Sequence, residues 1–130
     1  MKIFPGFSNG KEHNIALPEE FFSELLPLID HLGELKVTLF ALWFFEHQEG
    51  SLLYIRLQHF SQDAQLLNGL ANTREAALEM VEASILRACE RGTFLRYQPQ
   101  NQEIADALFF INTTRGRSAY RALQEGAWSP

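Results

Sequence analysis

The chain has 130 residues, of which 46% are hydrophobic, and its eleven phenylalanines provide ample apolar material for one domain with a packed core. Its net charge of −5 argues against a general polyanion binder. The charge is uneven, because residues 1–90 hold 6 basic and 13 acidic residues (−7) whereas residues 91–130 hold 5 and 3 (+2), so an anionic partner is expected to meet the C-terminal third.

Cellular location is indicated by the cysteine count and by the absence of an apolar leader. The single Cys89 cannot form a disulfide within the chain, which is typical of a reducing compartment. No basic segment followed by an apolar run opens the chain, and no apolar run is long enough to span a bilayer. We therefore expect a cytoplasmic protein without a membrane partner.

The N-terminal residues predict an arm followed by a short helix. Residues 1–16 have the turn-rich composition of an arm with apolar anchors, Phe4 and Phe7, and residues 17–130 are expected to form a single domain. Leu17–Leu26 predicts a helix, because Pro18 suits the first helical position and two glutamates follow it at the positive end of the helix dipole. Pro27 should end or kink this helix.

Leu32–His47 predicts a helix that is apolar on nearly every side. A domain of this size has difficulty enclosing every face of one helix, so we expect this helix both to centre the core and to leave an exposed patch. The sequence therefore predicts a homo-oligomer. We expect its interface to include the arm, with Phe4 and Phe7, or this helix, with Trp43 and Phe44.

The middle of the chain predicts a turn, a strand and two helices. Gln48–Ser51 should turn the chain, Leu52–Leu57 should form a short strand, and His59–Leu70 carries a weak helical pattern. The next helix should begin at Asn72 as N-cap, with Glu75 at the capping-box position, and end at Gly92.

The last-named helix has an apolar inner face and an acidic outer face. Ala77, Leu78, Val81, Ser84, Ile85 and Ala88 share the inner face, with Cys89 at its edge, and the outer side displays Glu75, Glu79, Glu82, Leu86 and Glu90. Thr93–Gln98 and Ala107–Asn112 then predict two strands joined by a polar loop without Lys or Arg. This order is that of an α+β winged helix with an N-terminal helical extension and a C-terminal helix.

In a winged helix the acidic outer face and the polar loop would lie against DNA. Carboxylates repel phosphates, and a loop without cations cannot make the common backbone contacts. The sequence therefore predicts that this domain binds duplex DNA weakly and without sequence preference.

Two segments carry a resemblance to a known family. They are Leu32–Trp43 (LGELKVTLFALW) and Ala88–Leu95 (ACERGTFL), with a short strand and a helix between them and a wing after them. In this order they resemble the N-terminal winged-helix domain of DnaD-type primosomal proteins, over residues 17–114. These proteins help to assemble the helicase-loading machinery in bacterial replication initiation and restart. The resemblance implies that this domain chiefly self-associates, with replication or primosome proteins as partners, while a separate C-terminal helical domain binds DNA.

Enzymatic motifs are poorly represented. Ser8–Lys11 matches Ser-x-x-Lys without a second motif, and His47–Glu49 matches the His-x-Glu of zinc deaminases without the cysteines that would complete a zinc site. His13, His31 and His59 have no metal-ligand spacing, and Cys89 is expected to be a buried, inert thiol. We expect no catalytic residue, no metal and no cofactor.

The start of the C-terminal helix carries an unusual concentration of cations. Thr113–Ser118 places Arg115 and Arg117 in or beside the first turn, where positive charge opposes the helix dipole. In one interpretation these arginines pair with acidic residues of the N-terminal part. In the other, Arg115, Arg117 and Arg121 form an anion site with free backbone N–H groups and meet a nucleic-acid phosphate.

These observations favour an oligomerising interaction module of a DnaD-like replication protein. The alternatives are a winged-helix transcription regulator that reads DNA directly and a structural adaptor without a replication role. An exposed recognition helix rich in Arg, Lys, Asn or Gln would support the regulator, but the predicted outer face offers mainly Glu.

Overall fold

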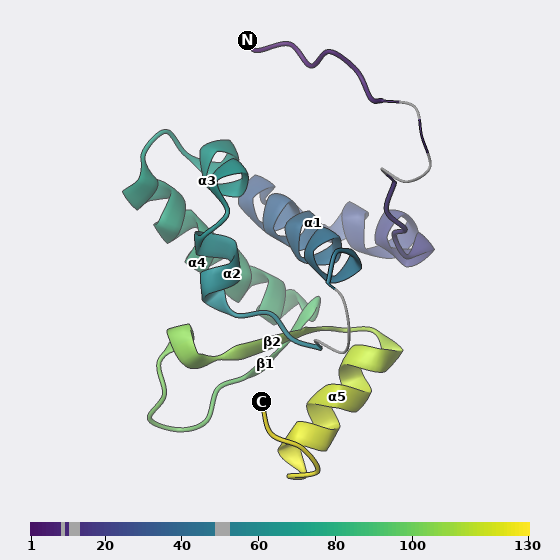
Figure 1. Cartoon of the computed structure of the whole chain (residues 1–130), viewed down its shortest axis with the longest axis vertical. Coiled ribbons are helices and arrows are strands. Elements are labelled where there is room, and N and C mark those ends of the chain that lie inside the picture. Colours follow the sequence, from purple (N-terminus) through teal and green to yellow (C-terminus); the bar gives the residue numbers. More distant parts are fainter. Residues whose placement is uncertain (9, 11–13, 49–52) are drawn as a thin grey trace.

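The computed structural model describes residues 1–8, 10, 14–48 and 53–130. Over these residues the chain is α+β and mostly helical, with one two-stranded antiparallel sheet (Figure 1), which confirms the predicted class. Predictions that fall on residues 9, 11–13 and 49–52 lie outside the described residues. They concern His13, the last residue of each enzymatic motif (Lys11 and Glu49), most of the turn Gln48–Ser51 and the first residue of the predicted strand, Leu52. Nowhere in the described ranges is a helix long and apolar enough to cross a membrane.

The predicted N-terminal helix is present but irregular. It contains a π-helical turn, Phe21–Leu25, followed directly by a 3₁₀ turn, Leu26–Leu28. Pro27 lies inside the 3₁₀ turn and lacks the N–H that a regular α-helix would need there. The helical segment ends at Leu28, two residues later than predicted. Phe21 is buried and anchors the segment, whereas Phe22 is exposed.

The predicted helix Leu32–His47 is confirmed as α1, Leu32–Glu46. His31 caps it, since its Nδ1 accepts the Glu34 N–H at 3.0 Å. Gly33 allows close packing against a later helix, α4: a Cβ added there would lie 2.5 Å from the Ser84 Oγ and 2.8 Å from the Met80 Sδ. The small residue therefore brings the start of α1 against the middle of α4.

The segment after α1 differs from the prediction at two points. Instead of a strand over Leu52–Leu57, the described residues make a single antiparallel bridge, between Ile55 and Phe109. Leu57 belongs to the next helix, α2, because the His59 Nδ1 accepts the Arg56 N–H at 2.8 Å and fixes a helix start.

The predicted helix His59–Leu70 is two helices. They are α2, Leu57–Ser61, and α3, Ala64–Leu70. Asp63 separates them, because its Oδ1 accepts the Leu66 N–H at 2.9 Å and caps a second helix.

The long helix α4, Arg74–Arg91, confirms the predicted inner face, although its N-cap is Thr73 and not Asn72. The Thr73 Oγ1 accepts the Ala76 N–H at 3.2 Å, which places Glu75 outside the capping-box position. Gly92 ends the helix as predicted, with φ at 92° and the Thr93 N–H bonded to the Ala88 carbonyl. The buried residues of α4 are Ala77, Val81, Ser84, Ile85 and Ala88.

Both predicted strands are confirmed and are shorter at each end. They are β1, Phe94–Tyr97, and β2, Leu108–Ile111, paired so that Phe94 faces Ile111 and Tyr97 faces Leu108. The loop between them contains a 3₁₀ turn, Ile104–Asp106.

A last helix, α5, Thr114–Gln124, covers the side of the sheet opposite α4 (Figure 1). On β2, Phe109 joins the main core with α1 and α4, whereas Leu108 and Phe110 join a second cluster under α5. Both faces of β2 are therefore covered, which explains its unbroken run of apolar residues.

Candidate functional site

One face of α1 is apolar and exposed. Leu32 (65% exposed), Leu39 and Trp43 (41% exposed) follow one another at seven- and four-residue intervals, which places them on one stripe of the helix. We call these three residues the α1 stripe. Phe44, the next residue along the helix, is rotated from Trp43 by about 100° around the helix axis. Its side chain lies in the core and is only 9% exposed. The α1 stripe thus includes Trp43 but not the predicted interface residue Phe44.

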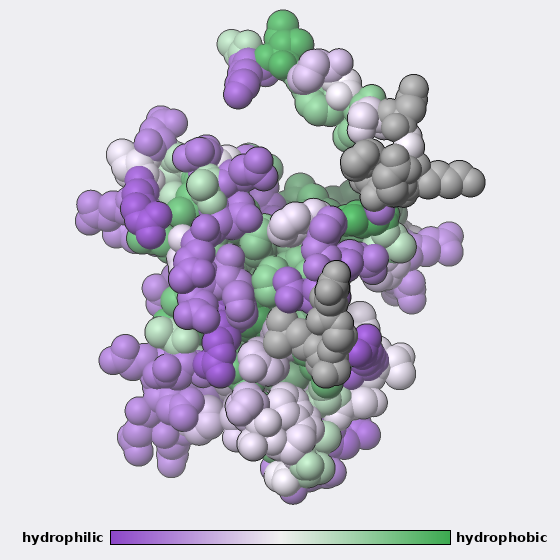
Figure 2. Space-filling model, in the orientation of Figure 1, coloured by the Kyte–Doolittle hydropathy of each residue, from purple (hydrophilic) through white to green (hydrophobic). Residues whose placement is uncertain are grey.

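The described residues of the arm are exposed and run away from the helical body (Figures 1 and 2). Phe4 and Phe7 contact each other edge-to-face, with ring centroids 4.8 Å apart. Phe7 is nonetheless 94% exposed. The two predicted anchors therefore hold each other and leave most of their apolar surface open.

The outer face of α4 is acidic, as the sequence predicts. Glu75, Glu79, Glu82 and Glu90 are exposed. Figure 2 shows hydrophilic residues over most of the visible face of the body, including the region of α2 to α4. A ligand approaching α4 from outside meets carboxylates first.

An ion-pair network that the sequence analysis missed joins α1 to α4. Glu34 is fully buried, and Arg91 holds both of its oxygens: the Nε donates to Oε2 at 2.6 Å and an Nη2 to Oε1 at 3.1 Å. Arg87 and Asp30 extend the network, with an Nη2 to Oδ1 distance of 2.9 Å. The hydrogen bond to Glu34 raises the pKa of Arg91. The visible signal was a glutamate on the buried side of an otherwise apolar helix.

Two of the three candidate arginines, Arg115 and Arg117, line different hollows. Arg115 lines a cavity of about 280 Å³ beside Leu42 and Phe45, whereas Arg117 lines a different cleft. Arg117 donates to the Asn112 Oδ1 at 3.0 Å and to the Thr114 Oγ1 at 3.2 Å, so its partners in the described part of the chain are neutral groups. Arg121 is exposed on α5.

Gly116 has a structural role at this helix start. A Cβ there would collide with the Ile111 carbonyl oxygen, so glycine lets α5 begin directly against the end of β2. The Thr113 Oγ1 caps the helix by accepting the Gly116 N–H at 3.0 Å. Packing against β2 therefore accounts for the glycine between Arg115 and Arg117.

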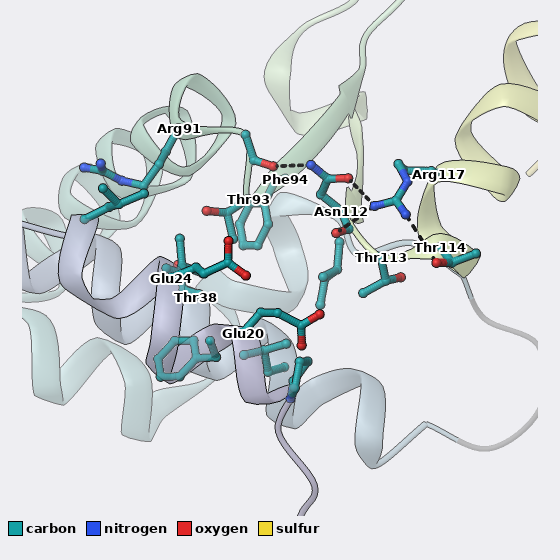
Figure 3. Close-up of a pocket in the computed structure, with 17 residues that line it drawn as sticks. Glu20, Glu24, Thr38, Arg91, Thr93, Phe94, Asn112, Thr113, Thr114 and Arg117 are labelled. Carbon is teal, nitrogen blue, oxygen red and sulfur yellow. Dashed lines mark hydrogen bonds between the residues drawn. The ribbon is translucent and has the colours of Figure 1, made fainter.

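A cleft of about 670 Å³ lies between the N-terminal helical segment, α1 and the end of the sheet where β1 begins and β2 ends. Glu20 and Glu24 reach into it from one side, and Asn112 and Arg117 lie on the other (Figure 3). Thr38 and Thr93 also line it, and the Oγ1 of each is buried without a hydrogen-bond partner. Four segments far apart in the sequence meet at this cleft.

Protein-family models, curated proteins and solved structures give no match to this chain. Functional assignment therefore starts from the surfaces and the cleft described above.

His31, His59 and Cys89 have structural surroundings. His31 and His59 act as hydrogen-bond acceptors at helix starts. Burial, with a contribution from Arg56, lowers the pKa of His59. Burial raises the pKa of Cys89 to about 11, which keeps its thiol protonated at neutral pH, as expected for an inert cysteine. Across the described residues, no three His, Cys, Asp or Glu side chains are grouped to hold a metal ion.

Proposed function

We propose that this chain is a non-enzymatic protein-interaction module that self-associates through the α1 stripe and the N-terminal arm. The observation that carries the proposal is the exposure of apolar side chains on both elements, Leu32, Leu39 and Trp43 on α1 and Phe4 and Phe7 on the arm. Exposed apolar side chains aligned on one stripe of a helix favour an interaction site there.

A second copy of the chain is the occupant that we propose for the α1 stripe. The arm extends from the body with its phenylalanines open, so it can lie across α1 of a neighbouring copy (Figure 1). In a two-fold symmetric dimer both arms would cover both stripes at once. Trp43 would be the central anchor, because buried tryptophans dominate the binding energy of interfaces.

We further propose that the fold is a winged helix and that the module acts in DnaD-like replication initiation or restart, in the cytoplasm. The order of α1, the Ile55 bridge, α2 to α4, β1 and β2 supports the winged-helix interpretation. The role in replication rests on the resemblance to DnaD-type N-terminal domains, which self-associate. The exposed glutamates of α4 favour this role over a regulator that reads DNA with that helix.

Sedimentation equilibrium and light scattering of the purified chain at tens of micromolar test the proposal. We expect a dimer or larger oligomer. Trp43→Ser should weaken association by about 30-fold, the equivalent of about 2 kcal/mol for loss of an interface anchor. Deletion of residues 1–8 should weaken it as well.

Phe22→Ser is the matched control, since Phe22 is an exposed phenylalanine outside the arm and outside α1. It should leave the oligomer unchanged. A monomer at tens of micromolar would refute self-association, and an oligomer insensitive to Trp43→Ser would exclude the α1 stripe as its interface.

A further inference from the structure

The cleft between the N-terminal helical segment and the sheet has two walls of opposite charge. Glu20 and Glu24 lie about one turn apart on the first wall, and Arg117 lies on the second (Figure 3). None of the ion pairs between described residues joins either glutamate to Arg117. The opposed charges thus face a shared hollow.

Arg117 is held in place without being neutralised by its described partners. Its two terminal nitrogens donate to oxygens of Asn112 and Thr114, which are uncharged, and a guanidinium has five N–H donors in all. Asn112 is itself fixed, because its Nδ2 donates to the Gly92 carbonyl at 2.7 Å. The N-terminus of α5 adds positive potential on the same side. This wall therefore suits a carboxylate.

The floor of the cleft combines apolar side chains with two buried hydroxyls. Phe21, Leu42 and Phe94 contribute apolar surface. Thr38 is only 1% exposed, yet its Oγ1 has no hydrogen-bond partner among the described residues. The Oγ1 of Thr93 is also buried and also has no hydrogen-bond partner there. An unpaired buried hydroxyl costs free energy, so two of them lining one hollow indicate that a polar ligand atom completes their bonding.

We propose that this cleft binds a small apolar zwitterion, an amino acid or a short peptide with free ends. Its ammonium group lies toward Glu20 and Glu24, its carboxylate lies toward Arg117 and the start of α5, and its apolar side chains lie on the floor. A hollow of about 670 Å³ is within the usual range of ligand sites and has room for more than one residue. Leucyl-leucine carries all three features and is the first probe.

Isothermal titration calorimetry of the full chain with leucine, leucyl-leucine and trileucine tests the proposal. We expect saturable binding of at least one of them at micromolar to millimolar concentration. Two blocked probes separate the walls: N-acetyl-leucyl-leucine lacks the ammonium charge, and leucyl-leucinamide lacks the carboxylate. Each should bind at least about tenfold more weakly, because each loses charge-assisted hydrogen bonds. Absence of saturable binding in the series, or equal binding of the blocked probes, would overturn the proposal.

Substitutions on each wall should change a different preference. Arg117→Gln should remove the preference for leucyl-leucine over leucyl-leucinamide, whereas the double change Glu20→Gln and Glu24→Gln should remove the preference over N-acetyl-leucyl-leucine. Arg121→Gln is the matched control, since Arg121 is exposed on α5 and does not line the cleft. Preferences that survive both wall variants would refute the assignment.

Thr38→Val tests the buried hydroxyl with little change in side-chain shape. We expect the melting temperature of the ligand-free protein to stay equal or rise, while binding of leucyl-leucine weakens several-fold. Ser84→Ala is the control, because the Ser84 Oγ is also buried without a partner but does not line the cleft. Unchanged binding in Thr38→Val would show that the Thr38 hydroxyl does not contact the ligand and would overturn its place in the site.

Discussion

At the scale of single residues, the least expected feature is the fully buried Glu34. It lies in the first turn of α1, where the helix dipole favours a carboxylate, and its partner Arg91 lies in the last turn of α4, where the dipole favours a cation. The start of α1 is thereby joined to the end of α4, while Gly33 packs against Met80 and Ser84 in the middle of α4. The pair fixes the α1–α4 contact on which the α1 stripe and the cleft both depend.

Removal of one member of this pair should be costly. Arg91→Met leaves the Glu34 carboxylate buried without its main partner, which we expect to destabilise the fold by about 3 kcal/mol or more. The double variant Glu34→Met, Arg91→Met should recover most of the loss, because no uncompensated charge remains. Thermal and urea unfolding measure both, with the exposed Arg74→Met as control. A double variant no more stable than the single one would contradict this account.

His59 should make stability depend on pH. Its Nδ1 accepts the Arg56 N–H, which a protonated ring cannot do, and burial lowers its pKa below the ordinary 6.5. Above pH 6.5 the neutral ring of His59 contributes its full stabilisation to the fold. As the pH falls below 6.5, the unfolded chain binds a proton at His59 before the folded chain does. The stabilisation is therefore lost progressively as the pH approaches the lower pKa of the folded state.

Urea midpoints at about pH 7.5 and about pH 5.5 measure this effect. His59→Asn keeps a side-chain acceptor but cannot titrate, so it should reduce the loss of stability on acidification. His47→Asn, on an exposed residue, should leave the loss unchanged. An equal pH dependence in His59→Asn and the parent would show that other groups control it.

At the scale of elements, periodicity and end signals were sufficient for the long helices and the hairpin. The inner face of α4, the Gly92 stop and the two strands followed from spacing alone. The break at Asp63 and the loss of the strand before α2 did not, because short helices are decided by single caps such as Asp63 and His59 rather than by periodicity. Such caps compete with neighbouring alternatives that only the folded chain resolves.

The cleft was beyond sequence reasoning for a different reason. Arg117 was singled out, but the residues opposite it lie about ninety positions earlier in the chain, on a segment predicted only as an ordinary helix. No spacing rule connects Glu20 or Thr38 with Arg117. Only the docking of α5 through Gly116 and of the N-terminal segment through Phe21 brings them together.

The start of α4 offers a direct test of cap choice. Thr73 accepts the Ala76 N–H, whereas its neighbour Asn72, an equally good cap by composition, is exposed and outside the helix. Thr73→Ala should cost about 1 kcal/mol. Asn72→Ala should stay within about 0.5 kcal/mol of the parent. Urea unfolding distinguishes the two, and equal costs would indicate that both side chains cap the helix in solution.

At the scale of the whole molecule, apolar and charged surfaces are divided between elements. Exposed apolar side chains lie on the arm, on the N-terminal helical segment and on the α1 stripe, while α4 presents carboxylates. Arg115 and Arg117 of α5 line separate hollows. In the self-association that we propose, the arm and the α1 stripe would be covered and the carboxylates of α4 would stay open. This division of surfaces leaves no concentrated positive surface among the described residues of α4 and the β1–β2 loop for a nucleic acid.

We therefore expect the parent chain to bind duplex DNA weakly and without sequence preference, with a dissociation constant of about 10⁻⁴ M at physiological salt. Fluorescence anisotropy with two unrelated duplexes measures this.

The triple change Glu75→Lys, Glu79→Lys, Glu82→Lys should tighten binding and steepen its salt dependence, because each new phosphate contact adds about 0.9 to the slope of log affinity against log salt. The same number of changes to Lys at Glu19, Glu46 and Glu125, which are exposed and lie outside both α4 and the β1–β2 loop, provides a charge-matched control. If the α4 carboxylates are what repels DNA, the α4 variant should exceed this control; equal gains would mean that net charge alone sets the affinity. Submicromolar, sequence-selective binding by the parent chain would instead favour a regulator that reads DNA directly.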